Sequence, residues 1–189
     1  MELKDVLRAR HSIRVFRSDP IDESVIREII EYASLAPSTL NLQPWHFHIA
    51  TGASRDAVNE IMAQTTQYLQ EYVDKLGSEV VDHAARFYAD LGGAPVIIGI
   101  STPVIDDPLV DQTNILLSVG ACIGNILLLA TERGLGACNL TVPRWVAQDL
   151  LHVFQVPEGR ELTSIMVLGV PDEEPVEHDR NPDVISWLR

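Results

Sequence analysis

The stretch that decides the fold is Val96-Ile97-Ile98-Gly99-Ile100, a run of apolar residues in which no polar side chain alternates. A strand with one solvated face alternates between apolar and polar residues, whereas a strand covered on both faces is apolar throughout. The run therefore predicts a central strand with a packed layer on each side. Gly92-Gly93 separates it from the helix predicted over 79–91.

Helices and shorter strands are predicted on both sides of this strand. Asp22 is the predicted N-cap of one helix and Ser54 of another, because short polar side chains accept hydrogen bonds from the free amides of a first turn. No repeat or linker divides the sequence, so we predict one domain over residues 1–189. Its fold class is α/β (α+β), with helices covering both faces of a mixed central sheet. The predicted helices are 3–10, 22–36, 54–76, 79–91, 109–133 and 143–154, and the other predicted strands are 46–51, 137–140 and 162–170.

Charge and composition exclude several classes of function. The chain has 14 Lys and Arg against 27 Asp and Glu, a formal net charge of −13, which disfavours a nucleic acid or an anionic membrane surface as partner. The apolar run 115–130 is shorter than the roughly 20 residues that cross a bilayer, which favours a buried helix. Cys122 and Cys138 are too few for a disulfide framework, and we expect reduced thiols. The acidic start lacks the pattern of a signal peptide, so we expect a cytoplasmic protein.

The first of two distinctive polar loops is Arg10-His11-Ser12-Ile13-Arg14. It places two guanidiniums, an imidazole and a hydroxyl within five residues of a strongly acidic chain. Planar Arg forks bind phosphate oxygens in pairs, where a Lys acts only as a point charge. Taken alone, the loop fits either an anion-binding site or a solvated basic loop, because charge clusters are common on protein surfaces.

The second loop, residues 36–45, reads Ala-Pro-Ser-Thr-Leu-Asn-Leu-Gln-Pro-Trp. Amide side chains offer both donors and acceptors, which suits the edge of a heterocycle or a chain of hydroxyl groups. The same residue types also suit turns and caps, with Trp45 as a core anchor. The loop alone does not separate a ligand-binding role from a structural one.

Together, in this order and spacing, the two loops resemble those of the FMN-dependent nitroreductase-like flavoproteins. The resemblance continues through the long predicted helix to the end of the chain, and so it spans nearly the whole sequence. The residues that carry it are Arg10, Ser12, Arg14, Ala36, Pro37, Ser38, Asn41, Gln43, Pro44, Trp45 and Phe47, then Gly-Leu-Gly-Ala-Cys at 134–138, Leu-Gly-Val-Pro at 168–171, and Arg180 before Pro182.

The resemblance implies an obligate homodimer with two FMN sites at the interface, each built from both subunits. It assigns a role to twelve residues and leaves two positions open. His178 stands where many members have a second basic residue, and Leu140-Thr141-Val142 replaces a glycine-rich segment. The implied contacts are Arg10, Ser12, Arg14 and Arg180 to the phosphate and flavin edge, His11 to the ribityl chain or ring, Pro37, Ser38, Thr39 and Asn41 to the partner's flavin, and the backbone of Asn139, Leu140 and Thr141 to the ring near N5.

The resemblance also implies the reaction. Hydride would pass from NADH or NADPH to FMN and then to a small acceptor such as a nitroaromatic, quinone or enone, by a ping-pong mechanism. The flavin carries the hydride chemistry itself, and the sequence has no HExxH, GxSxG, Walker lysine or GxGxxG motif, so we nominate no catalytic side chain. The alternatives are a specialised relative that fragments flavin or removes a halogen reductively, and a flavin-binding redox module without turnover.

Three further features carry expectations. His46 and His48 alternate on a predicted strand, but no third ligand is near in sequence, so we predict a solvent-facing pair and no metal site. Gly120 and Gly124 form a GxxxG spacing that suits a close helix pair, either between subunits or within the chain. The tail, 172–189, is acidic yet ends in apolar residues that a disordered tail normally lacks, so we expect it to pack on the partner subunit.

Overall fold

The computed structural model describes residues 1–107, 109–175, 177 and 179–188. A five-stranded sheet has the order β1-β5-β3-β2, and β4 pairs with the side of β5 that faces away from β3. The ladders between named strands are antiparallel, and the parallel pairing among the described residues is the isolated bridge between Ser12 and Ala137. The elements are α1 (Leu3–Ala9), β1 (Phe16–Arg17), α2 (Glu23–Ala33), η1 (Thr39–Asn41), β2 (His46–Thr51), α3 (Gly52–Ala63), α4 (Thr66–Leu69), η2 (Gln70–Tyr72), α5 (Val73–Leu76), α6 (Ser78–Asp90), η3 (Leu91–Gly93), β3 (Val96–Pro103), α7 (Gln112–Glu132), β4 (Gly136–Thr141), α8 (Ala147–Val153) and β5 (Arg160–Pro171).

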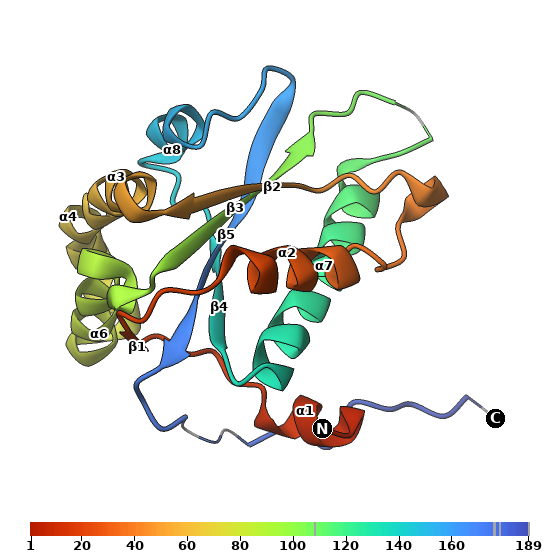
Figure 1. The fold of residues 1–189 in the computed structure, drawn as a ribbon, viewed down its shortest axis with the longest axis horizontal. Helices are drawn as coiled ribbons and strands as arrows, with labels where there is room; N and C mark the ends of the chain where they lie inside the picture. The colour runs from red at the N-terminus through yellow and green to blue at the C-terminus, as the bar shows by residue number, and fades with distance from the viewer. Residues whose placement is uncertain (108, 176, 178, 189) are drawn as a thin grey trace.

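The sheet separates two apolar layers, as the run 96–100 predicts. Helices α2 and α7 cover one face, and α3, α6 and α8 cover the other (Figure 1). Successive side chains of a strand point to opposite faces, so Ile98 and Ile100 pack with α2 and α7, whereas Ile97 packs with the other layer. Each of these isoleucines is fully buried, which stabilises the fold by about 1.5–3 kcal/mol per side chain.

The predicted helix 54–76 is wrong as one continuous helix. The structure divides it into α3, α4, η2 and α5, with a break at Gln64 and Thr65. The apolar periodicity continues through this break, which is why the sequence does not reveal it. Helix α3 also begins earlier than predicted: Thr51 is its N-cap, and Ser54 lies one turn inside, where its hydroxyl accepts from the Thr51 amide at 3.1 Å.

Other boundaries also differ from the prediction, among them the start of α7 at Gln112 and the start of β5 at Arg160. Helix α8 begins at Ala147, because Pro143 to Val146 form a turn in which the Val146 amide donates to the Pro143 carbonyl at 3.2 Å. Strand β1 was not predicted, since two residues carry no periodic signal. The N-cap at Asp22 is confirmed by its acceptance of the Ser24 amide at 2.9 Å.

Helix α7 has one buried side and one exposed apolar side that has no partner among the described residues. It is 21 residues long and, by length and composition alone, could cross a bilayer, a test that core helices of water-soluble proteins also pass. A Cβ atom added at Gly120 or Gly124 would meet nothing within 4 Å, so the close packing within the chain that GxxxG allowed is absent from the described residues. Leu117, on the same side, is 69% exposed.

Candidate functional site

The first loop lies along the start of β4. The Ile13 amide donates to the Ala137 carbonyl at 3.2 Å, next to the bridge between Ser12 and Ala137. This approach requires glycine at 136, because a Cβ atom there would lie 2.7 Å from the Cβ of Ile13. The contact therefore brings the residues of the first loop to the edge of the sheet that β4 forms.

Glu173 fixes the backbone of the first loop from the far end of the chain. Its Oε1 accepts from the amides of Arg14, at 2.5 Å, and Val15, at 3.3 Å, while the Asp172 amide donates to the Val15 carbonyl at 2.9 Å. The guanidiniums of Arg10 and Arg14 have no ion-pair partner in the part of the chain that the structure describes. No pattern in the sequence indicated this role of Glu173, which lies 159 residues from Arg14.

Strand β4 presents Asn139, Leu140 and Thr141 near this loop. Asn139 and Thr141 are exposed, and Leu140 points into the core. The Asn139 Oδ1 accepts from the Ser164 hydroxyl at 2.6 Å, which orients the amide. The ladder of β4 is with β5, and among the described residues no strand covers its other edge beyond Ala137. The structure therefore brings together the predicted residues 10–14 and 139–141.

The neighbouring thiol is not a nucleophile. Burial raises the pKa of Cys138, and Glu173 adds to this, although Arg14, Arg10 and the Ser12 hydroxyl act in the opposite direction. Burial likewise raises the pKa of the Cys122 thiol to about 12. A thiol needs a lowered pKa to react at neutral pH, so both free cysteines are core residues, as expected.

The second loop lies elsewhere, at the N-terminal half of α7 (Figure 1). Pro37, Ser38 and Thr39 line a shallow hollow of about 280 Å³ with side chains of α7. The backbone amide of Thr39 donates to the Ser118 hydroxyl at 3.1 Å. The side chain of Asn41 is exposed, and its Oδ1 accepts from Nε2 of the Gln43 side chain at 3.3 Å. Within one chain, the two predicted loops do not form one site.

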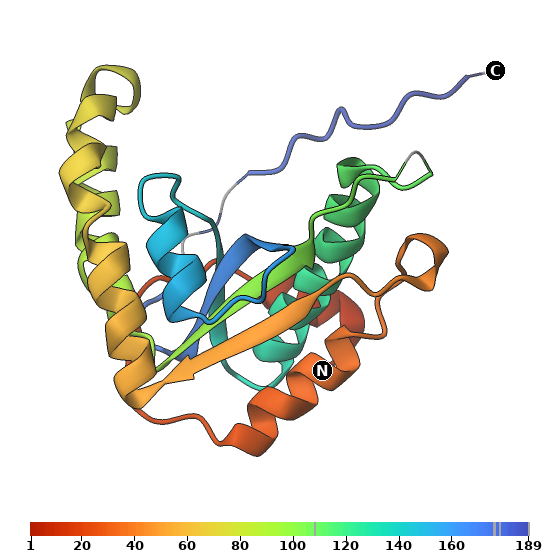
Figure 2. The ribbon, with the colours of Figure 1, turned by 90° about the horizontal axis from the view of Figure 1, so that it is seen from above.

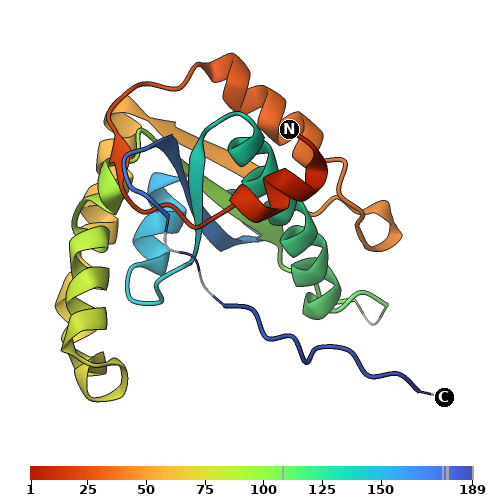
Figure 3. The ribbon, with the colours of Figure 1, turned by 90° about the horizontal axis from the view of Figure 1, so that it is seen from below.

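The C-terminal tail leaves the body of the molecule (Figures 2 and 3). Arg180 is exposed on it. Trp187 is 79% exposed and Leu188 is 98% exposed, so no part of the chain that the structure describes covers these two side chains. His178, the position left open by the sequence, lies outside the described residues.

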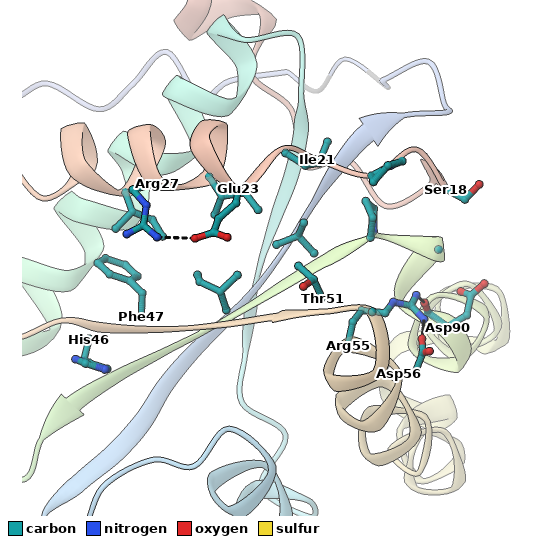
Figure 4. Close-up of a pocket in the computed structure, with 18 of the residues that line it drawn as sticks. Ser18, Ile21, Glu23, Arg27, His46, Phe47, Thr51, Arg55, Asp56 and Asp90 are labelled. Carbon is teal, nitrogen blue, oxygen red and sulfur yellow. Dashed lines mark hydrogen bonds and ion pairs between the residues drawn. The ribbon is translucent and has the colours of Figure 1, made fainter.

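A large cavity lies away from the twelve residues to which the resemblance assigns a role in binding FMN. It is a groove of about 1210 Å³ between α2 and β2, which is the last strand in the sheet order (Figure 4). Its walls carry Ile26 and Ile30 from α2 and Phe47 and Ile49 from β2, and the ion pair of Arg27 with Glu23 lies at its rim. A long apolar groove beside an unpaired strand edge suits a polypeptide segment better than a phosphate ester.

The predicted solvent-facing pair of histidines is wrong for His48. His46 is exposed, but His48 is half-buried, with its Nε2 at 2.9 Å from the Ser101 hydroxyl. Burial, followed by the charges of His46 and Arg160, lowers the pKa of His48, although a hydrogen bond with the Phe154 backbone acts in the opposite direction. The described residues hold no group of three possible metal ligands.

Solved structures with this arrangement of elements cover the whole chain. The BluB-like flavoprotein from Clostridium difficile 630 matches with a TM-score of 0.80 and 24% identity over 100% of both chains. The FMN-dependent nitroreductase NfnB from Mycobacterium smegmatis, solved in complex with NADPH, matches with a TM-score of 0.81 and 20% identity, over 98% of this chain and 97% of that one. The architecture is therefore the nitroreductase-like α+β fold.

The sequence comparisons give the family. The sequence model of the nitroreductase family matches residues 7–170. A protein named NADH dehydrogenase from Thermus thermophilus is 34% identical, over 99% of this chain and 96% of its own length. The chain belongs to the nitroreductase family, which confirms the resemblance carried by the two loops.

Proposed function

We propose that the chain is an FMN-dependent oxidoreductase that takes hydride from NADH or NADPH and delivers it to a small acceptor such as a nitroaromatic, quinone or enone. The observation that carries this proposal is the gathering of Arg10, Ser12 and Arg14 beside the open edge of β4, in a chain of this family. The relative NfnB, named as FMN-dependent and solved with NADPH, supports the choice of cofactor and donor. When bound, FMN supplies the hydride chemistry itself.

The residues of the first loop fit the phosphate of FMN. Arg10 and Arg14 have unused guanidinium donors in an otherwise acidic chain, and charge-assisted bonds to phosphate oxygens are strong. Ser12, which is exposed, adds a hydroxyl donor. Backbone groups on the open edge of residues 139–141 would orient the ring, and no titratable side chain is assigned a proton in the reaction.

The complete site would need two subunits. The second loop, with Pro37, Ser38, Thr39 and Asn41, lies against α7 and away from the first loop, so it would serve the cofactor of a second copy. The exposed apolar side of α7 around Leu117 and Gly120 is continuous with this loop and suits a homodimer interface. Obligate dimers bury large apolar surfaces of this kind.

The tail would complete the dimer by entering the groove of the partner. Its last residues include the exposed apolar side chains of Val184, Ile185, Trp187 and Leu188, while the groove is mainly apolar and flanked by an unpaired strand edge. A chain that ends at Asp183 keeps Arg180 but loses these side chains. We expect that variant to sediment mainly as a monomer and to bind FMN weakly. A fully dimeric variant with full flavin content would contradict this role of the tail.

The visible spectrum of the purified protein is the first test. Oxidised flavin gives bands near about 370 and 450 nm, and oxidation of NADH or NADPH by a quinone then measures turnover. A colourless protein that takes up no FMN would refute the proposal, and flavin without turnover would favour the redox module. A panel of nitroaromatic, quinone, enone and halogenated acceptors separates a general reductase from a specialised relative. The cytoplasmic location stays a prediction.

A further inference from the structure

The second loop holds an unusual backbone shape. Leu40, Asn41 and Gln43 have φ angles of 48°, 55° and 45°, in the left-handed region. Residues with a Cβ atom rarely adopt this region, at a cost of about 1–3 kcal/mol each for most of them. Three such residues within four positions keep this shape only if surrounding contacts hold both ends of the loop.

The beginning of the loop is held by α7 and by a bond within the loop. The Thr39 amide donates to the Ser118 hydroxyl at 3.1 Å, and that hydroxyl donates to the Asn114 carbonyl at 2.7 Å. The Gln43 amide donates to the Ser38 hydroxyl at 3.0 Å. None of these bonds involves Pro44, where the loop joins β2, so another group must fix this end of the loop.

Arg160 provides that contact from the first residue of β5. Its guanidinium donates from Nη2 to the carbonyls of Pro44 and Ser101, both at 2.7 Å, and from Nε to the Ser101 hydroxyl at 3.0 Å. The side chain is half-buried, and this burial lowers the pKa of Arg160. Arg160 has no carboxylate partner among the described residues, so its charge is satisfied by these three acceptors, as a partly desolvated cation requires.

We propose that Arg160 is a positioning residue that fixes the end of the second loop, and thereby sets how Ser38, Thr39 and Asn41 are presented. The planar guanidinium is needed because its Nε and Nη2 are held apart in a fixed geometry that matches the acceptors of Pro44 and Ser101, whereas a Lys ends in a single nitrogen on a flexible chain. The part of this inference that concerns cofactor binding rests on the proposed function. The part that concerns the shape of the loop does not.

Hydrogen exchange on the full-length protein tests the anchor without relying on activity. The variants are Arg160→Gln and Arg160→Lys, with Thr102→Val as the matched control. Thr102→Val removes the 2.7 Å bond between Thr102 and Thr163, one residue along β3, without a contact to Pro44. In Arg160→Gln we expect the amides of residues 38–43 to exchange about tenfold faster or more, because three bonds from a charged donor are lost. Arg160→Lys should give a smaller increase, and Thr102→Val none.

Flavin affinity separates this inference from the proposed function. If wild-type protein binds FMN, Arg160→Gln should raise the Kd for FMN several-fold, and Thr102→Val should not. Equal exchange of residues 38–43 in the Arg160 variants and the control would overturn the anchor, and faster exchange with an unchanged Kd would overturn its link to the cofactor. If wild-type protein binds no FMN, the proposed function fails, while the exchange comparison still decides the anchor. If Arg160→Gln does not fold, the same two measurements are made on Arg160→Lys.

Discussion

Replacing Gly92 by Ala should displace the first loop. Gly92 lies in η3 with a φ of 65°, and a Cβ atom there would lie 1.8 Å from the carbonyl oxygen of Arg14, where ordinary contacts begin at 3.4 Å. The oxygen belongs to the backbone and cannot rotate away. The variant therefore forces the loop that holds Arg14 away from η3.

The magnitude follows from two separate costs. A left-handed conformation costs an alanine about 1–2 kcal/mol, and forcing the packed backbone apart adds about 1–3 kcal/mol. Gly134→Ala is the matched control, because Gly134 has a φ of 73° but nothing within 4 Å of an added Cβ atom. We expect Gly92→Ala to lower the free energy of unfolding by about 2–5 kcal/mol, and Gly134→Ala by about 1–2 kcal/mol.

Urea unfolding measures both variants, and FMN titration shows whether the displacement reaches the site. Gly92→Ala should weaken FMN binding at temperatures where the protein is still folded, whereas Gly134→Ala should leave it unchanged. Equal losses of stability in the two variants would show that Arg14 does not lie against η3. A destabilised Gly92→Ala variant with normal FMN affinity would refute the placement of the phosphate at this loop.

Three more predictions follow from the site. Arg10→Ala should weaken FMN binding by about 2 kcal/mol or more, roughly 30-fold in Kd, because a charge-assisted contact is lost; an unchanged Kd would remove Arg10 from the site. The pKa of His48 in the folded state is lowered from 6.5, so as the pH falls the unfolded state takes up a proton at a higher pH than the folded state does. The contribution of His48 to the free energy of unfolding is therefore fully present above about pH 6.5, and it decreases as the pH drops toward the folded-state pKa. His48→Gln should therefore lose less stability than wild type between pH 7.5 and 5.5 in urea unfolding, and equal losses would contradict this. Initial rates over a grid of NAD(P)H and quinone concentrations should give parallel double-reciprocal lines, and intersecting lines would mean that both substrates occupy the site together.

Local patterns in the sequence predicted the layers but not the joints between elements. The run 96–100 predicted a buried strand because five consecutive residues without a polar side chain indicate burial on both faces. The break at Thr65 does not change the apolar pattern of the sequence, since an α-helix and a short 3₁₀ segment have similar apolar spacing over a few residues. Likewise, Ser54 and Thr51 are both suitable caps by residue type, and only the backbone geometry separates them.

The sequence could place candidate residues together where they are adjacent in the chain, as in the loop 10–14 and the segment 139–141, and their role in binding FMN stays a prediction. Contacts were not predictable where the partners are distant. Glu173 reaches the amide of Arg14 across 159 residues, and Arg160 reaches Pro44 across 116. A glutamate or an arginine in isolation carries no signal of such a contact, because most residues of these types are solvated.

The open edge of β2 has a consequence for the newly made protein. A single folded chain exposes a six-residue strand, with Ile49 42% exposed, and such an edge is a template for incorrect pairing with other chains. The net charge of −13 opposes this, because identical subunits repel one another at long range. That repulsion is screened over about 10 Å at 0.1 M salt. The salt concentration during refolding should therefore set the balance between correctly folded chains and aggregates, independently of the stability of the folded chain.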